Sequence, residues 1–156
     1  MVWNTGCRVI ANGLDFPINI VDLEDDHFAL SIPSREVKDF NSVIFPWCNS
    51  RWEVEHKAFR VSSMVTGKVG LYLFQEFATN KICWSPSDKP WDVKKVLRNG
   101  SQSGDELEPR SNIDVYILPD RVWGVPAQNN NNVAKQVLDE SLNIIGAITS
   151  IAALFI

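Results

Sequence analysis

Apolar side chains recur along residues 3–123 in short runs separated by polar and turn-forming residues. In residues 28–32 and 113–117 the large apolar side chains occupy every second position, so each segment would place them on one face of a strand. Runs of this kind, about ten residues apart, are typical of antiparallel sandwiches and barrels. We therefore predict a mainly β fold over residues 1–126, an antiparallel β-sandwich of about eight or nine short strands. The predicted strands are residues 7–12, 16–23, 27–32, 42–47, 51–56, 58–63, 68–74, 81–85 and 113–118.

Two of the predicted strands have distinctive patterns. Residues 51–55 alternate between Trp52 and Val54 on one face and charged side chains on the other, which predicts a strand with Trp52 in the core. Residues 68–74 are apolar on both faces, as expected of a central strand that is covered on both sides. Gly70 within that strand indicates a β-bulge or a close approach of another segment to the backbone.

The composition changes after residue 126. Residues 127–131 are rich in asparagine and read as a linker, whereas residues 132–156 contain no proline and follow the helical period. We predict one C-terminal α-helix over 132–156, amphipathic up to Asn143 and apolar beyond it. The residues that this helix would use for assembly or membrane contact are Ile144, Ile145, Gly146, Ile148, Ser150, Ile151, Leu154 and Phe155.

The apolar end of the predicted helix has to be buried, because its side chains together represent on the order of 10–20 kcal/mol of transfer free energy. It could be buried by copies of the chain, by lipid, by the chain's own core or by another protein. Residues 141–156 would form a helix of about 24 Å, whereas the apolar core of a bilayer is about 30 Å thick, so a single span is marginal. Gly146 and Ser150 have the spacing of small residues that lets helices pack closely, which favours a homo-oligomer.

Length and charge exclude some classes of function. A chain of 156 residues fits one domain with a sizeable core. Its net charge is −4 and no basic run exceeds two residues, so we expect no nucleic-acid partner and no charge-driven binding to anionic lipid. The first residues lack the basic and apolar regions of a signal peptide. We therefore expect a protein that is cytoplasmic or released without a cleavable signal, with membrane association if the helix inserts into lipid.

Tryptophan is unusually frequent, with six in the chain. Trp47, Trp84 and Trp91 lie beside prolines or turn residues near predicted strand ends. Tryptophans in such positions close the open ends of a sandwich core, and they also stack on sugar rings. The three residues are therefore the candidate ligand-binding set of a carbohydrate-binding module.

Acidic residues gather in two predicted loops. Asp22, Asp25 and Asp26 lie in one, and Asp105 and Glu106 lie in the other. Hard cations take six to eight oxygen ligands, usually from loops, so two acidic loops at one end of a sandwich could hold calcium. The spacing does not match an EF-hand, and acidic loops also serve simply as solvated surface. No cofactor is firmly implied, and calcium is the one cation that the pattern suggests.

Catalytic motifs are not evident. The three cysteines, Cys7, Cys48 and Cys83, are widely spaced and form no CxxC pair, which favours buried free thiols. A nucleophilic pair of Cys48 with His56 would depend on the fold rather than on spacing. An enzyme whose site is assembled across strands is therefore the third hypothesis, behind two binding functions.

The leading hypothesis is a non-enzymatic, self-associating β-sandwich whose C-terminal helix drives oligomerisation and membrane insertion. A small sandwich with tryptophans at its edges and one amphipathic helix resembles small cytolysins and lectin-like modules in plan. The first likeness implies assembly with copies of itself and contact with lipid, and the second implies a glycan ligand.

Overall fold

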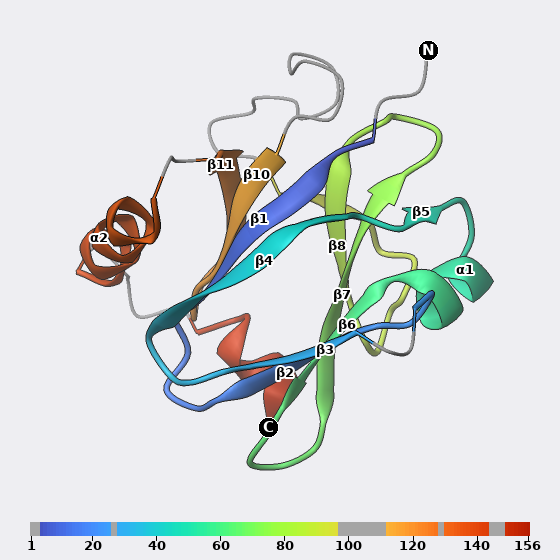
Figure 1. Cartoon of the computed structure of the whole chain (residues 1–156). Coiled ribbons are helices and arrows are strands. Elements are labelled where there is room, and N and C mark those ends of the chain that lie inside the picture. The colour runs from blue at the N-terminus through green and yellow to red at the C-terminus, as the bar shows by residue number, and fades with distance from the viewer. Residues whose placement is uncertain (1–3, 26–27, 97–111, 128–129, 144–148) are drawn as a thin grey trace.

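The computed structural model describes residues 4–25, 28–96, 112–127, 130–143 and 149–156. These residues form two β-sheets, with four and seven strands, together with two α-helices (Figure 1). The prediction of a mainly β, two-sheet fold with a helix in the C-terminal part is therefore confirmed.

The four-stranded sheet joins segments from both halves of the chain. Its strand order is β11-β10-β1-β4, and only the pairing of β1 with β10 is parallel. Its strands are β1 (Gly6–Asn12), β4 (Glu36–Ile44), β10 (Asn112–Ile117) and β11 (Val122–Pro126).

The seven-stranded sheet has the order β3-β2-β6-β7-β8-β9, with β5 pairing in parallel with β7. Its strands are β2 (Ile18–Asp22), β3 (Ala29–Ile32), β5 (Trp47–Cys48), β6 (Phe59–Ser63), β7 (Val69–Glu76), β8 (Ile82–Pro86) and β9 (Lys94–Lys95). The apolar faces of both sheets contribute to one main core, in which Phe40 and Phe45 each pack against Phe59 with ring centroids 5.3 Å apart.

Strand β7 has the central position that its two apolar faces predicted. It lies between β6 and β8. Gly70 was expected to mark either a β-bulge or a close approach of another segment, and the structure has both at this position. Val61 pairs with Leu71 and Ser62 pairs with Val69, so Gly70 is the extra residue of a bulge. A Cβ atom at position 70 would lie only 2.4–2.5 Å from the ring of Phe155, so this ring needs a glycine beneath it.

The predicted strand over residues 51–56 is wrong. This segment is helix α1 (Arg51–Lys57), and Trp52 is 62% exposed rather than part of the core. Ser50 caps the helix by accepting a hydrogen bond from the Glu53 backbone amide, and the Glu53 carboxylate accepts one from the Asn49 amide. A capping box of this type stabilises the first turn of a helix through specific hydrogen bonds. The alternation of only five residues is a less specific indication of a strand. Val54 alone is fully buried on α1.

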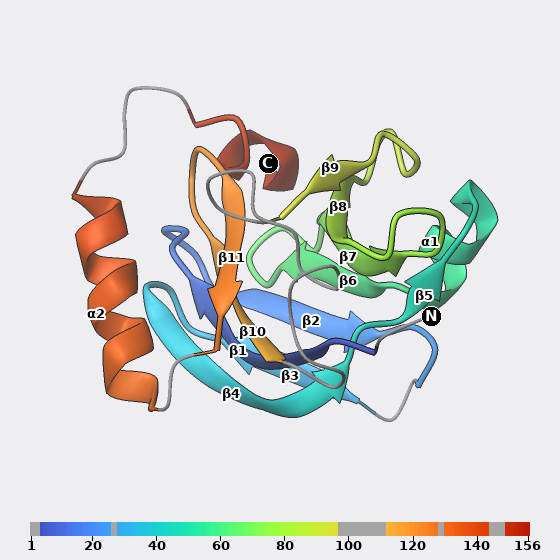
Figure 2. The same cartoon turned by 90° about the horizontal axis from the view of Figure 1, so that it is seen from above.

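The single helix predicted over 132–156 is also wrong. Helix α2 (Asn131–Leu142) is capped by Asn130, whose side chain accepts a hydrogen bond from the Val133 amide, and it covers the outer face of the four-stranded sheet (Figure 2). The chain then returns as a separate 3₁₀ turn, η2 (Ala152–Phe155), beside the seven-stranded sheet. Within the parts of the chain that the structure describes, no helix is long and apolar enough to cross a membrane.

The returning segment, residues 149–156, belongs to the main core. Ile151 is 3% exposed and Phe155 is 1% exposed, and both pack with residues of the two sheets. The backbone amides of Ile151 and Ala152 donate hydrogen bonds to the carbonyl of Pro119, at 2.9 and 3.1 Å. These two residues are therefore buried by their own chain. The spacing of Gly146 and Ser150 had instead favoured burial between copies of the chain in a homo-oligomer.

Candidate functional site

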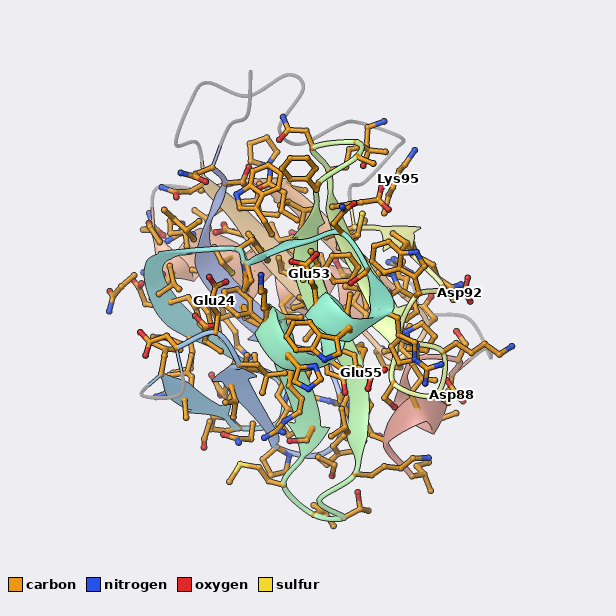
Figure 3. The ribbon with its side chains drawn as sticks, turned by 90° about the vertical axis from the view of Figure 1, so that its right-hand side faces the viewer. Glu24, Glu53, Glu55, Asp88, Asp92 and Lys95 are labelled. Atoms are coloured by element: carbon orange, nitrogen blue, oxygen red, sulfur yellow. The ribbon has the colours of Figure 1, made fainter. Side chains whose placement is uncertain are left out.

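A cleft of about 540 Å³ opens between α1, the start of β5 and the turn after β2. Its volume falls within the range of small-ligand sites. Three segments that are distant in the sequence form it, and Figure 3 views the molecule from the side on which α1 and the labelled Glu24 and Glu53 lie. The lining residues are Asp22, Glu24, Asp25, Ile44, Phe45, Pro46, Trp47, Cys48, Asn49, Glu53, Lys57 and Phe77.

One wall of the cleft is aromatic. The rings of Trp47 and Phe77 meet edge to face, with centroids 6.1 Å apart and planes at 75°. The Trp47 indole N–H donates a 3.0 Å hydrogen bond to the Asn4 side-chain oxygen, which fixes the orientation of the ring. Phe77 is 56% exposed and Ile44 is 49% exposed, so this wall presents apolar surface that nothing in the described chain covers.

Another part of the lining is acidic. Asp22 is only 6% exposed, and its carboxylate accepts hydrogen bonds from the backbone amides of Glu24 and Asp25, at 3.0 and 3.2 Å. Burial raises the pKa of Asp22, and these two amides partly oppose the rise. The side chains of Glu24 and Asp25 stay exposed at the mouth of the cleft.

Helix α1 adds a fourth carboxylate from its first turn, Glu53, and a single ammonium group from its last turn, Lys57. Lys57 binds Glu53 at 2.8 Å, and this hydrogen bond lowers the pKa of Glu53. The lining therefore contains four carboxylates, from Asp22, Glu24, Asp25 and Glu53, and one cation. The cleft is suited to ligands that carry positive charge or donate hydrogen bonds.

The calcium hypothesis is only partly covered by the structure. Asp22 and Asp25 line the cleft, whereas Asp26, Asp105 and Glu106 lie outside the described residues. Within the described ranges, no group of three or more His, Cys, Asp and Glu side chains is arranged to hold a metal ion. Calcium binding across the two acidic loops stays a prediction.

The three candidate tryptophans occupy different environments. Trp47 lines the acidic cleft, and Trp84, 8% exposed, lines a separate cavity on the other side of β8. Trp91 is 38% exposed and stacks on Phe74, with ring centroids 6.0 Å apart. Trp47 and Trp84 therefore do not line one shared cavity, and Trp47 is the one that lies with the acidic residues of the first loop.

The cysteines are buried, as expected. Cys7, Cys48 and Cys83 are free thiols, and burial raises the pKa of Cys48 and of Cys83 to about 12. Cys48 packs against Phe74 and Cys83, whereas His56 is exposed and stacks on Trp52. The structure therefore gives no contact between Cys48 and His56 that would activate a nucleophile.

These thiols should be unreactive until the protein unfolds. A thiol whose pKa is near 12 is almost entirely protonated at pH 8, and the thiolate is the reactive form. With Ellman's reagent at pH 8 we expect less than about a tenth of the thiols to react within the time in which all three react in denaturant. Rapid reaction of one thiol in the native protein would contradict this burial.

The cleft contains residues that the sequence did not single out. Ile44 ends β4, Phe77 lies in the turn after β7, and neither shares a motif with Trp47, so only the fold brings them together. Glu53 could have been found, because Ser50 and Glu53 have the spacing of a capping box.

Comparison of the chain with protein-family models, curated proteins and solved structures finds no match in any of the three.

Proposed function

We propose that this chain is a non-enzymatic binding module whose cleft takes a cationic group, with the lysine or arginine side chain of a partner polypeptide as the ligand class. The observation that supports it is the pairing of an exposed aromatic wall, Trp47 and Phe77, with four carboxylates and one ammonium group. Aromatic faces and carboxylates attract a cation by independent mechanisms, so a site that offers both selects for charge and for shape.

Further acidic side chains lie on the same side of the molecule. Figure 3 labels Glu55, Asp88 and Asp92 in the view that labels Glu24 and Glu53. Glu55 is paired with Arg51 and Asp92 with Lys94, and Lys95 lies at the edge of this view. Acidic groups spread over one face raise the local concentration of a basic partner and speed its association.

A glycan is the second candidate for the same cleft. The Trp47 ring is held in place by Asn4, and the exposed carboxylates of Glu24 and Asp25 accept hydrogen bonds as sugar hydroxyls require. A neutral sugar would not offset the negative charge of the lining, in which four carboxylates face one ammonium group, and for that reason we rank it below a cation. The two candidates differ in salt dependence, because only the cation loses affinity as ionic strength rises.

Self-association through the C-terminal segment stays a prediction. Ile144, Ile145, Gly146 and Ile148 lie outside the described residues. Ile151 and Phe155 are buried in the chain's own core and are not available to a second copy while they stay there. Contact of a second copy or of lipid with Ile151 or Phe155 would therefore require release of the returning segment, whereas Ser150 is exposed and Leu154 half-buried.

Binding of a short lysine- and arginine-containing peptide should depend on the acidic wall. We expect Glu24→Gln to weaken binding about threefold to tenfold at low salt, because one exposed carboxylate near a bound cation contributes about 1 kcal/mol. Isothermal titration calorimetry in 20 and 300 mM salt measures both the affinity and its salt dependence.

The matched control is Glu140→Gln on α2, an exposed glutamate outside the cleft, which should leave the affinity unchanged. Equal loss in both variants would show a general charge effect and contradict the cleft as the site. Salt-independent binding of a neutral oligosaccharide, with no binding of the peptide, would replace the cation by the glycan.

A further inference from the structure

We propose a second binding site, for a small amphipathic carboxylate, in a cavity of about 430 Å³ between β8, β9, β11 and the returning segment. It shares no lining residue with the Trp47 cleft, so it does not depend on the function proposed for that cleft. A medium-chain fatty acid in monomeric form is the ligand class that fits it.

The interior of this cavity is apolar. Trp84 and Pro86 come from β8, Val122 comes from β11, and Ile151 and Leu154 come from the returning segment. The walls thus include one strand from each sheet and the segment that connects to η2.

Backbone contacts hold the third wall in place. The Ile151 amide donates to the Pro119 carbonyl at 2.9 Å, and the Ser150 hydroxyl donates to the Asp120 carbonyl at 3.3 Å. Further along, the Thr66 hydroxyl donates to the Phe155 carbonyl at 2.9 Å. The cavity is consequently bounded by fixed backbone rather than by side chains alone, which favours a preformed site.

The rim of the cavity is basic. Lys94, Lys95 and Arg121 line it together with one carboxylate, Asp120, and that carboxylate binds Arg121 at 2.7 Å. Lys94 binds Asp92 at 2.8 Å and lies 5.7 Å from the centre of the Trp84 ring. For Lys95, no ion pair is found within the residues that the structure describes.

Among the described residues, Arg121 is paired with Asp120 and Lys94 with Asp92, so Lys95 gives this rim its excess positive charge, opposite in sign to the Trp47 cleft. Lys95 projects at the edge of the face in Figure 3, away from Glu24 and Glu53. An anionic head group at the rim would contact Lys95 while an apolar body fills the space beside Trp84. This charge complementarity selects an anion over a neutral or cationic amphiphile.

The size of the cavity limits the apolar body. A volume of about 430 Å³ lies within the range of small-ligand sites, so the cavity can take a medium-length acyl chain. Laurate below its micelle concentration is therefore the probe.

Laurate should bind with a change in tryptophan fluorescence, because Trp84 lines the cavity. We expect Lys95→Gln to weaken binding about fivefold and Leu154→Trp, which fills the apolar space, to abolish it. Lys38→Gln on β4, an exposed lysine outside the cavity, is the matched control and should leave the affinity unchanged. Thermal unfolding of each variant verifies that the fold is retained.

Two comparisons identify the head group and the source of the ligand. Dodecyltrimethylammonium, with the same chain and a positive head group, should bind at least tenfold more weakly than laurate. The site is overturned if laurate does not bind, if folded Leu154→Trp still binds it, or if the cationic amphiphile binds equally well. Binding to anionic lipid vesicles without binding of monomeric laurate would also overturn it.

Discussion

Replacing Phe155 with alanine should lower the free energy of unfolding by about 3–5 kcal/mol. The ring is 1% exposed, lies over the backbone of Gly70 and meets Phe16 with ring centroids 5.6 Å apart. Its removal would leave a void between β7 and the returning segment, which the rigid strand cannot close. Urea denaturation followed by tryptophan fluorescence measures the change.

The neighbouring Ile156 is the matched control. It is 79% exposed, so Ile156→Ala should change the free energy of unfolding by less than about 0.5 kcal/mol. If Phe155→Ala had an equally small effect, the segment would not be docked in solution, and burial between copies of the chain would regain its support. The mass of the native protein, measured on the same samples, distinguishes a monomer from an oligomer.

Gly70 gives an independent test of the same contact. Gly70→Ala would place a Cβ within 2.4–2.5 Å of the Phe155 ring, so it should destabilise the wild-type protein. In the Phe155→Ala background the ring is gone, and the same substitution should cost much less. The difference between the two costs is the coupling energy, which is expected for residues in direct contact.

Replacing Asp114 with asparagine should also cost about 3–5 kcal/mol, through an unpaired buried charge rather than a void. The Asp114 side chain is fully buried, and it accepts two hydrogen bonds from Arg8, at 3.0 and 2.8 Å. The third guanidinium nitrogen of Arg8 donates to Asn131 at the start of α2, at 3.1 Å. The pair therefore connects β1, β10 and α2, and its loss should destabilise all three elements together.

The exposed pair of Arg35 and Asp15 is the control for Asp114. Its atoms are 2.7 Å apart, almost the same distance as in the buried pair, but the two side chains are 60% and 79% exposed. Asp15→Asn should therefore cost less than about 1 kcal/mol. Denaturation curves of the two variants in the same buffer test whether burial, and not distance, sets the cost. Equal costs would contradict this account.

The sequence predicted the two-sheet architecture because long strands bury one face. Ile113, Val115 and Ile117 all lie in the main core, as their alternation required, and β7 is central with Gly70 in a bulge. Strand β4 was predicted only at its C-terminal end. Most of its side chains face solvent at the edge of a sheet, and Asn41 and Ser42 have positive φ within a bulge, so no alternation marks it.

Composition predicted that the C-terminal segment is buried but could not predict which surface buries it. The contact that decides this joins Phe155 to Gly70, far apart in the chain, and neither residue alone indicates the other. The same limit applied to the site. Trp47 and the acidic loop were separate candidates in the sequence, and only the fold places Trp47 in one cleft with Asp22 and Asp25.

Strand β1 lies between β4 and β10, and its contact from Arg8 to Asp114 spans 106 residues. The edge of β1 that pairs with β4 can form its hydrogen bonds early in synthesis. The edge that pairs with β10 cannot do so until β10 has been synthesised. Because closing so long a loop has to precede the pairing, we expect slow folding. During synthesis the antiparallel pair of β1 and β4 would expose an unpaired edge to other nascent chains, and a chaperone that shields strand edges should raise the yield of folded protein.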